Sequence, residues 1–117
     1  MTALPAGTTL ISQWVCTELA SVLARQARMK EMPRKEARKV FDLLDQLVKT
    51  GLIRMIPVDG IDFDQAALWV MGAPVPLRGP DALHLAITYR INARLLSLDA
   101  KLLVAAQWAG VGVKEIP

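Results

Sequence analysis

The hydrophobic positions of the chain alternate between two patterns along nearly its whole length. Short runs of adjacent apolar residues are typical of buried strands, and apolar residues repeated every three or four positions are typical of helices. The runs predict four strands, at residues 8–12, 52–58, 94–98 and 111–116. The repeats predict five helices, at residues 12–30, 33–50, 62–71, 81–91 and 99–110. This alternation favours an α/β fold with parallel strands and right-handed crossovers.

The expected helix boundaries rest on residues that commonly cap helices. Ser12 is the expected N-cap of the first helix, and Pro33 begins the second. Asp62 and Gln65 have the spacing of a capping box, which would open the third helix. Gly110 follows the last helix, where a glycine commonly ends the helical turn. The first two helices are therefore expected to form an antiparallel pair.

The size and composition of the chain indicate one domain, residues 1–117, with a hydrophobic core. Hydrophobic residues make up 53% of the sequence. Gly72, Pro74 and Pro76 interrupt the longest candidate for a membrane span, so we expect no membrane segment. A single cysteine, Cys16, excludes an internal disulfide and favours a reducing cytoplasm.

Positive charge is concentrated in the first half of the chain. Residues 1–54 contain nine Lys and Arg against five Asp and Glu, whereas residues 55–117 contain five against six. The excess runs through the first two expected helices, at Arg25, Arg28, Lys30, Arg34, Lys35, Arg38 and Lys39. Such a surface can follow the phosphates of a nucleic acid, with an affinity that falls as salt rises. The alternative is an ordinary solvated helix face.

Two aspartates occupy the positions where an α/β fold gathers functional groups. Asp81 lies in the first turn of a helix, and Asp99 follows the strand at residues 94–98. Ligands of open α/β sheets bind outside the carboxyl ends of the strands. Two carboxylates at that edge favour a hard divalent cation, Mg²⁺ or Mn²⁺. Each also has a structural alternative, because Asp81 complements a helix dipole and Asp99 is a suitable N-cap.

Glu18 is the third candidate ligand. Helical spacing places it beside the apolar stripe of the first helix, and its neighbours three and four positions away carry no positive charge. A carboxylate that leans towards a core favours a bound cation. A solvated glutamate at the margin of the stripe is the alternative.

Three further residues near the aspartates are weaker candidates. His84 follows Asp81 by one helical turn and is expected to support a ligand or the fold rather than to act as a base. Arg78 and Ser97 could contact a phosphate or a metal ligand. The three tryptophans lie in expected helices, where core packing is favoured over base stacking.

The segments that carry these residues also follow a known pattern. In the C-terminal third they are Asp-Ala-Leu-His-Leu-Ala (81–86), Leu-Leu-Ser-Leu-Asp (95–99), Leu102-Leu103 and Ala109-Gly110-Val111. Upstream they are Leu10-Ile11-Ser12 and Thr17-Glu18-Leu19-Ala20. Together they resemble a PIN domain, and most closely the VapC ribonuclease toxins of bacterial and archaeal toxin–antitoxin pairs.

The resemblance implies a fold, an activity and partners. The fold is a three-layer α/β/α domain with a mostly parallel sheet. The activity is that of a Mg²⁺- or Mn²⁺-dependent endoribonuclease, with Glu18, Asp81 and Asp99 as catalytic metal ligands. Their carboxylates are then expected to converge within roughly 10 Å, near enough to share one ion. The partners are an RNA substrate, an antitoxin that covers the acidic groove, and a second copy of the chain.

One departure from the family pattern bears on activity. The resembling domains begin with a strand that ends in Asp-Thr/Ser-Ser, whose aspartate is a metal ligand. Residues 1–9 contain no acid, and Pro5 and Gly7 disfavour a central strand there. We therefore expect an N-terminally truncated PIN-like domain with little or no RNA cleavage. The alternative function is a catalytically inactive remnant that serves only for dimerisation or antitoxin binding.

Overall fold

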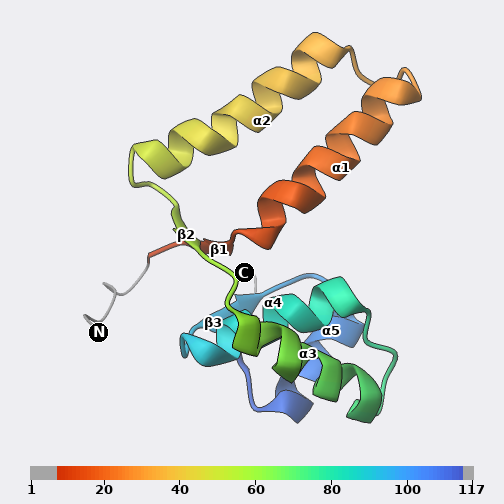
Figure 1. Cartoon of the computed structure of the whole chain (residues 1–117), viewed down its shortest axis with the longest axis vertical. Helices are drawn as coiled ribbons and strands as arrows, with labels where there is room; N and C mark the ends of the chain where they lie inside the picture. The colour runs from red at the N-terminus through yellow and green to blue at the C-terminus, as the bar shows by residue number, and fades with distance from the viewer. Residues whose placement is uncertain (1–7, 115–117) are drawn as a thin grey trace. The chain divides into compact units, whose positions relative to one another are not determined.

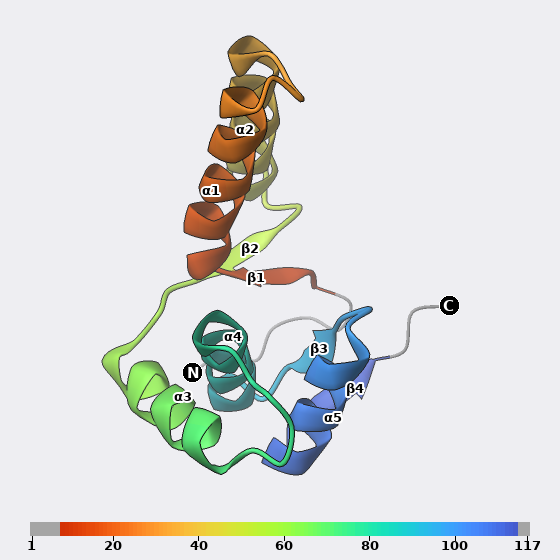
Figure 2. The ribbon, with the colours of Figure 1, turned by 90° about the vertical axis from the view of Figure 1, so that its right-hand side faces the viewer.

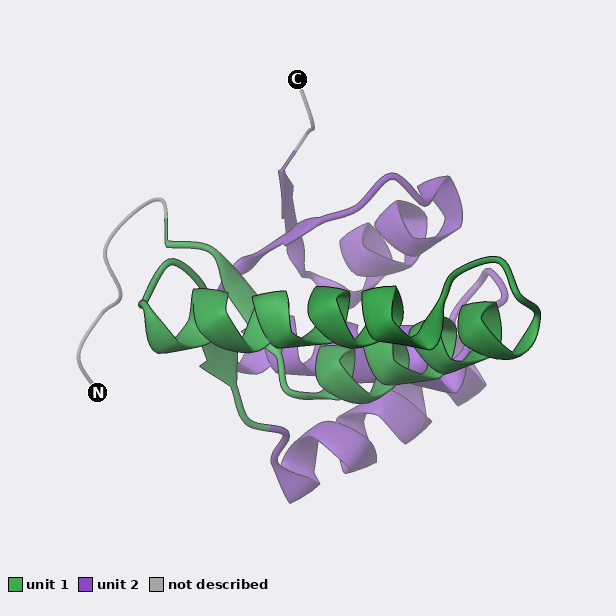
Figure 3. Ribbon diagram, turned by 90° about the horizontal axis from the view of Figure 1, so that it is seen from above, with its two compact units in different colours: residues 1–57 green, residues 58–117 purple. Residues whose placement is uncertain are grey.

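The computed structural model of the chain describes residues 8–114, and the expected features of residues 1–7 and 115–117 lie outside this part. The chain divides into two compact units, Met1–Pro57 and Val58–Pro117, which Figure 3 shows in separate colours. Five helices and four short strands are described, so the expected mixed α/β class is confirmed. Each unit has its own two-stranded parallel sheet.

The first unit is a helical hairpin between two strands. In order it contains β1 (Leu10–Ser12), α1 (Trp14–Arg28), α2 (Arg34–Lys49) and β2 (Arg54–Ile56). The strands pair in parallel with Leu10 opposite Arg54, and the amide of Gln13 donates to the carbonyl of Ile56 at 2.8 Å. Figure 1 shows α1 and α2 running side by side away from this sheet, as the sequence predicted.

The ends of the hairpin helices differ slightly from the expected ones. Gln13 occupies the N-cap position of α1, and the hydroxyl of Ser12 accepts a hydrogen bond from the amide of Trp14 at 3.1 Å. The prediction of Ser12 as the N-cap was therefore wrong by one residue, although its hydroxyl still satisfies a helix amide. The helix ends at Arg28 because Lys30 has a left-handed backbone, with φ of 57°. The start of α2 after Pro33 and its end at Thr50 agree with the prediction.

The second unit is organised around its second helix. It contains α3 (Gly60–Gly72), α4 (Gly79–Arg90), β3 (Arg94–Leu96), α5 (Ala100–Ala109) and β4 (Gly112–Lys114). Helix α4 supplies half of the buried apolar side chains described in this unit, namely Ala82, Leu83, Leu85, Ala86 and Ile87. Figure 2 shows α4 beside α3 and near the β3–β4 strand pair. Because α4 is buried on several faces, its position fixes the residues at both of its ends.

The capping box of α3 lies three residues earlier than expected. Asp59 is the N-cap, and the amide of Asp59 donates to the carboxylate of Asp62 at 2.9 Å. The predicted box of Asp62 with Gln65 was therefore wrong. Asp62 is the third residue of the helix, where its carboxylate reaches back to the cap.

Asp62 is also the largest polar side chain that the described residues bury, with 1% of its surface exposed. Arg90, at the end of α4, donates to it through Nε at 2.8 Å and through Nη2 at 3.0 Å. The hydrogen bond to Asp62 raises the pKa of the Arg90 guanidinium, which stays charged. This bidentate pair fixes the start of α3 against the end of α4.

The strand β3 is shorter and more exposed than the sequence indicated. A buried strand over residues 94–98 was predicted, but the strand ends at Leu96, which is 60% exposed, and Leu98 is 85% exposed. That prediction was wrong because the side chains of Leu96 and Leu98 are not covered by other elements, and because β3 ends at Leu96 and pairs only with β4 among the described strands. An apolar strand surface is therefore open in this unit.

The Asp62–Arg90 pair gives the first testable prediction. Arg90→Met should lower the free energy of unfolding by about 3 kcal/mol, because it leaves a buried carboxylate without its cation. Asp62→Asn should cost less, because the Arg90 side chain is 32% exposed and can turn to water. Urea unfolding followed by tryptophan fluorescence measures both, with the exposed Asp64→Asn as control. A loss for Arg90→Met no larger than that for Asp64→Asn would contradict the structural role of the pair.

Candidate functional site

The two aspartates of the predicted site both lie at helix N-termini in the second unit. Asp81 is half-buried in the first turn of α4, directly after Pro80. Asp99 is the N-cap of α5 and lies three residues beyond the end of β3. Both placements agree with the sequence analysis. A helix N-terminus carries partial positive charge, which attracts negatively charged side chains to these positions.

The orientation of the Asp99 side chain is set by backbone amides. Its Oδ1 accepts hydrogen bonds from the amides of Lys101 at 2.9 Å and Leu102 at 3.3 Å. The N-cap role, which was the structural alternative for Asp99, is therefore confirmed. Within residues 8–114, Oδ2 accepts no hydrogen bond from a described donor, so one oxygen is held and the other can meet a cation.

Ser97 stabilises the turn that precedes α5. Its hydroxyl accepts a hydrogen bond from the amide of Asp99 at 3.1 Å. This bond fixes the backbone between β3 and α5, and with it the direction of the Asp99 side chain. Ser97 thus supports a candidate ligand through the backbone.

Glu18 belongs to the first unit, where it is half-buried on α1. The three carboxylates are thus divided between the two units, and their convergence within roughly 10 Å stays a prediction. Across the described ranges, no group of three or more His, Cys, Asp or Glu side chains is arranged to hold a metal ion.

The weaker candidates surround Asp81 on α4. His84 is half-buried one turn after Asp81, and its carbonyl accepts a hydrogen bond from the Thr88 hydroxyl at 2.7 Å. Arg78 is exposed at the N-cap position of α4, where its side chain is accessible to a phosphate.

The tryptophans were expected to pack in the core. Trp69 meets Tyr89 edge to face at 5.6 Å between ring centres, which is a packing contact. Trp108 is 44% exposed, so its expected core position was only partly right.

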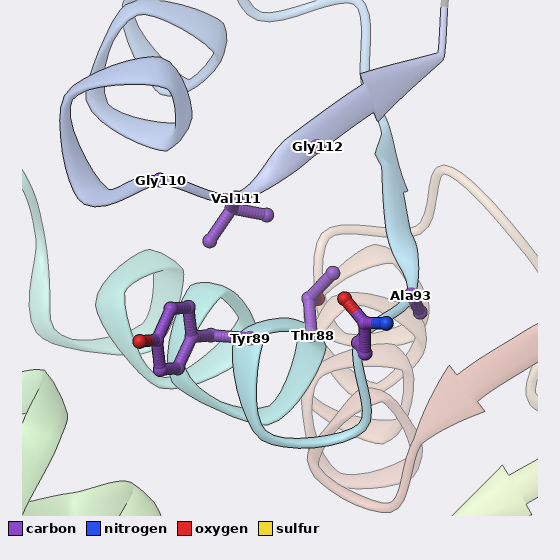
Figure 4. Close-up of a pocket in the computed structure, with 7 residues that line it drawn as sticks. Thr88, Tyr89, Ala93, Gly110, Val111 and Gly112 are labelled. Atoms are coloured by element: carbon purple, nitrogen blue, oxygen red, sulfur yellow. The ribbon is translucent and has the colours of Figure 1, made fainter.

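A hollow of about 310 Å³ lies at the opposite end of α4 from Asp81. Figure 4 shows Thr88 and Tyr89 on one side of it and the chain from Gly110 to Gly112 on the other. Its lining contains hydroxyl and amide groups but no carboxylate, thiol or imidazole. The hollow therefore lacks the groups that metal-dependent hydrolysis requires, and the candidate site stays at the aspartates.

The sequence analysis missed two features of the described residues. One is the Asp62–Arg90 pair, for which the spacing of Asp59 and Asp62 was the only local signal. The other is a hollow between α1 and α2 that combines alanines with two arginines. The alanines recur at helical spacing in the sequence. The hollow could not be predicted from that spacing, because residues of both α1 and α2 line it.

Comparison with known proteins leaves the family open. No protein-family model matches the chain, and no curated protein sequence matches it. No helix in the described part is both long enough and apolar enough to cross a membrane.

Substitution can separate two contributions of Asp99 to stability, the hydrogen bonds of its cap and its negative charge. Asp99→Ala should lower the free energy of unfolding by about 1 kcal/mol, because the amides of Lys101 and Leu102 lose their acceptor. Asp99→Asn keeps an acceptor at the cap and should cost less than about 0.5 kcal/mol. Urea denaturation of the three proteins measures the difference. Equal losses for Asn and Ala would show that the charge, and not the cap, provides the stability.

Proposed function

We propose that the chain is a PIN-like, metal-dependent endoribonuclease domain of the VapC toxin type. The observation that carries the proposal is the placement of Asp81 and Asp99 at the N-termini of two helices of one unit, the second three residues after the end of a parallel strand. This is where ligands of parallel α/β folds bind. The proposal implies the three-layer α/β/α fold of that family and a place in the cytoplasm.

The donor groups suit Mg²⁺ or Mn²⁺. Both ions prefer oxygen ligands, and Asp99 has one carboxylate oxygen without a described hydrogen-bond donor. Asp81 would hold the ion from the first turn of α4, and Glu18 is the third ligand that the resemblance implies. A bound ion supplies activation of a water molecule and stabilises charge on the phosphate under attack.

Further groups of the second unit support this chemistry. Ser97 orients Asp99 through the backbone, and the exposed Arg78, at the N-cap of the helix that carries Asp81, can contact an RNA phosphate. His84, one turn after Asp81 on α4, would have a supporting role. These residues orient and neutralise groups, so none is required as a base.

A second function is favoured by the exposed leucines beside Asp99. Leu96 and Leu98 present an apolar surface where a strand edge is open. Such a surface favours association with another chain. In this alternative the chain is catalytically inactive and serves as a dimerisation or antitoxin-binding module.

Metal binding and cleavage are tested together. We expect Mn²⁺ to bind in calorimetric titration and Asp81→Asn to weaken binding about tenfold, because one anionic ligand is lost. Cleavage of a fluorescent RNA should be slow, sensitive to EDTA and abolished by Asp81→Asn. The matched control is Asp64→Asn, an exposed aspartate on α3.

The outcomes separate the two functions. Metal-dependent cleavage that survives in Asp64→Asn and is lost in Asp81→Asn supports the nuclease. Metal binding without cleavage, together with self-association or capture of an antitoxin, supports the inactive module. If the unsubstituted chain binds no Mn²⁺, the nuclease proposal is wrong.

A further inference from the structure

The helical hairpin of the first unit contains a hollow of about 340 Å³ between α1 and α2. Its apolar lining consists of four alanines with Leu23 and Phe41, and Arg34 and Arg38 complete it from α2. Figure 1 shows the two helices that form it lying side by side. Small side chains on facing helices leave a shallow surface that another helix can approach closely.

The charge around this hollow is mainly positive. Residues 25–39 contain seven Lys and Arg but only two Glu, and all seven cations are exposed. Two of the seven have ion-pair partners on α2, where Arg38 meets Asp42 at 3.1 Å and Lys39 meets Glu36 at 3.4 Å. The other five form no ion pair with any residue from 8 to 114, namely Arg25, Arg28, Lys30, Arg34 and Lys35.

We propose that this hollow binds an acidic amphipathic helix of a partner protein. An apolar stripe of such a helix would lie on the alanines, Leu23 and Phe41, in the manner of a helix in a groove. Its carboxylates would meet Arg34 and Arg38, whose guanidinium groups can each bind a carboxylate with two hydrogen bonds. The surrounding cations would speed association and select against basic partners.

The apolar lining distinguishes this partner from RNA. A nucleic acid would use the cations for its phosphates but gains little from an alanine surface, since its bases stack on exposed aromatic rings. Phe41 is the one aromatic residue that lines the hollow. The proposal does not depend on nuclease activity, because it involves neither Asp81 nor Asp99.

The test uses a fluorescein-labelled helical peptide of the length of α1, with leucines on one stripe and glutamates elsewhere. Fluorescence anisotropy with the full chain should show binding that weakens as NaCl is raised. Two control peptides are a scrambled sequence of the same composition, which has no apolar stripe, and one with lysines in place of the glutamates. Both should bind at least about tenfold more weakly, because one lacks the stripe and the other the complementary charge.

Two pairs of variants locate the binding surface. Arg34→Glu should weaken binding about tenfold, whereas Lys35→Glu, which changes the same charge one position away and outside the lining, should weaken it about twofold. Ala24→Phe fills the hollow and should also weaken binding about tenfold, whereas Ser21→Phe on the same helix should not. All four positions are exposed, and circular dichroism checks that each variant folds.

Other results would overturn the proposal. Equal binding of the scrambled peptide, or equal effects within each pair of variants, would show that the hollow is not the site. Tighter binding of a single-stranded RNA oligonucleotide, with the same dependence on Arg34, would assign the surface to nucleic acid. A dimer that Ala24→Phe converts to a monomer in analytical ultracentrifugation would assign it to a second copy of the chain.

Discussion

The second unit depends on one buried charge. The carboxylate of Asp62 is almost fully removed from water, and it is stable there because Arg90 and the amide of Asp59 supply hydrogen bonds to it. A buried carboxylate without such partners is strongly unfavourable. The pair therefore requires the start of α3 and the end of α4 to lie together, and α4 is the helix that supplies half of the buried apolar side chains described in this unit.

This constraint reaches the candidate site through α4. Arg90 ends the helix and Asp81 lies in its first turn, so the helix that the ion pair holds also positions the carboxylate at its other end. Asp99 is held independently, by the cap of α5 and by the bond between Ser97 and its amide. Each aspartate is thus placed by a rigid helix terminus, which is the kind of support that a metal ligand needs.

The local features of the fold could be predicted from the sequence. Helix order, the N-cap at Asp99 and the left-handed glycine at 110 follow from short-range patterns, and all three agree with the structure. The capping box was misplaced because Asp59, Asp62 and Gln65 offer two overlapping boxes. Only the partner of Asp62 decides between them, and Arg90 lies 28 residues away.

Other errors have the same origin in non-local structure. The pattern of residues 94–98 indicated a buried strand, but burial depends on which elements cover the faces of the strand, and Leu96 and Leu98 stay exposed. The hollow on the hairpin could not be predicted because it forms only where α1 and α2 pack against each other. For the candidate site, the sequence placed Asp81 and Asp99 correctly at helix starts, but no local pattern could show which oxygen of Asp99 is held by the cap.

The central claim is that Asp81 and Asp99 bind the same divalent ion. Paramagnetic broadening of backbone amide signals by substoichiometric Mn²⁺ tests it most directly. The amides next to Asp81 and Asp99 should broaden together at the lowest Mn²⁺ concentrations, and Asp81→Asn should reduce the broadening at both positions to the same extent. Broadening at only one of them, or equal broadening at exposed carboxylates such as Asp64, would contradict a shared metal site.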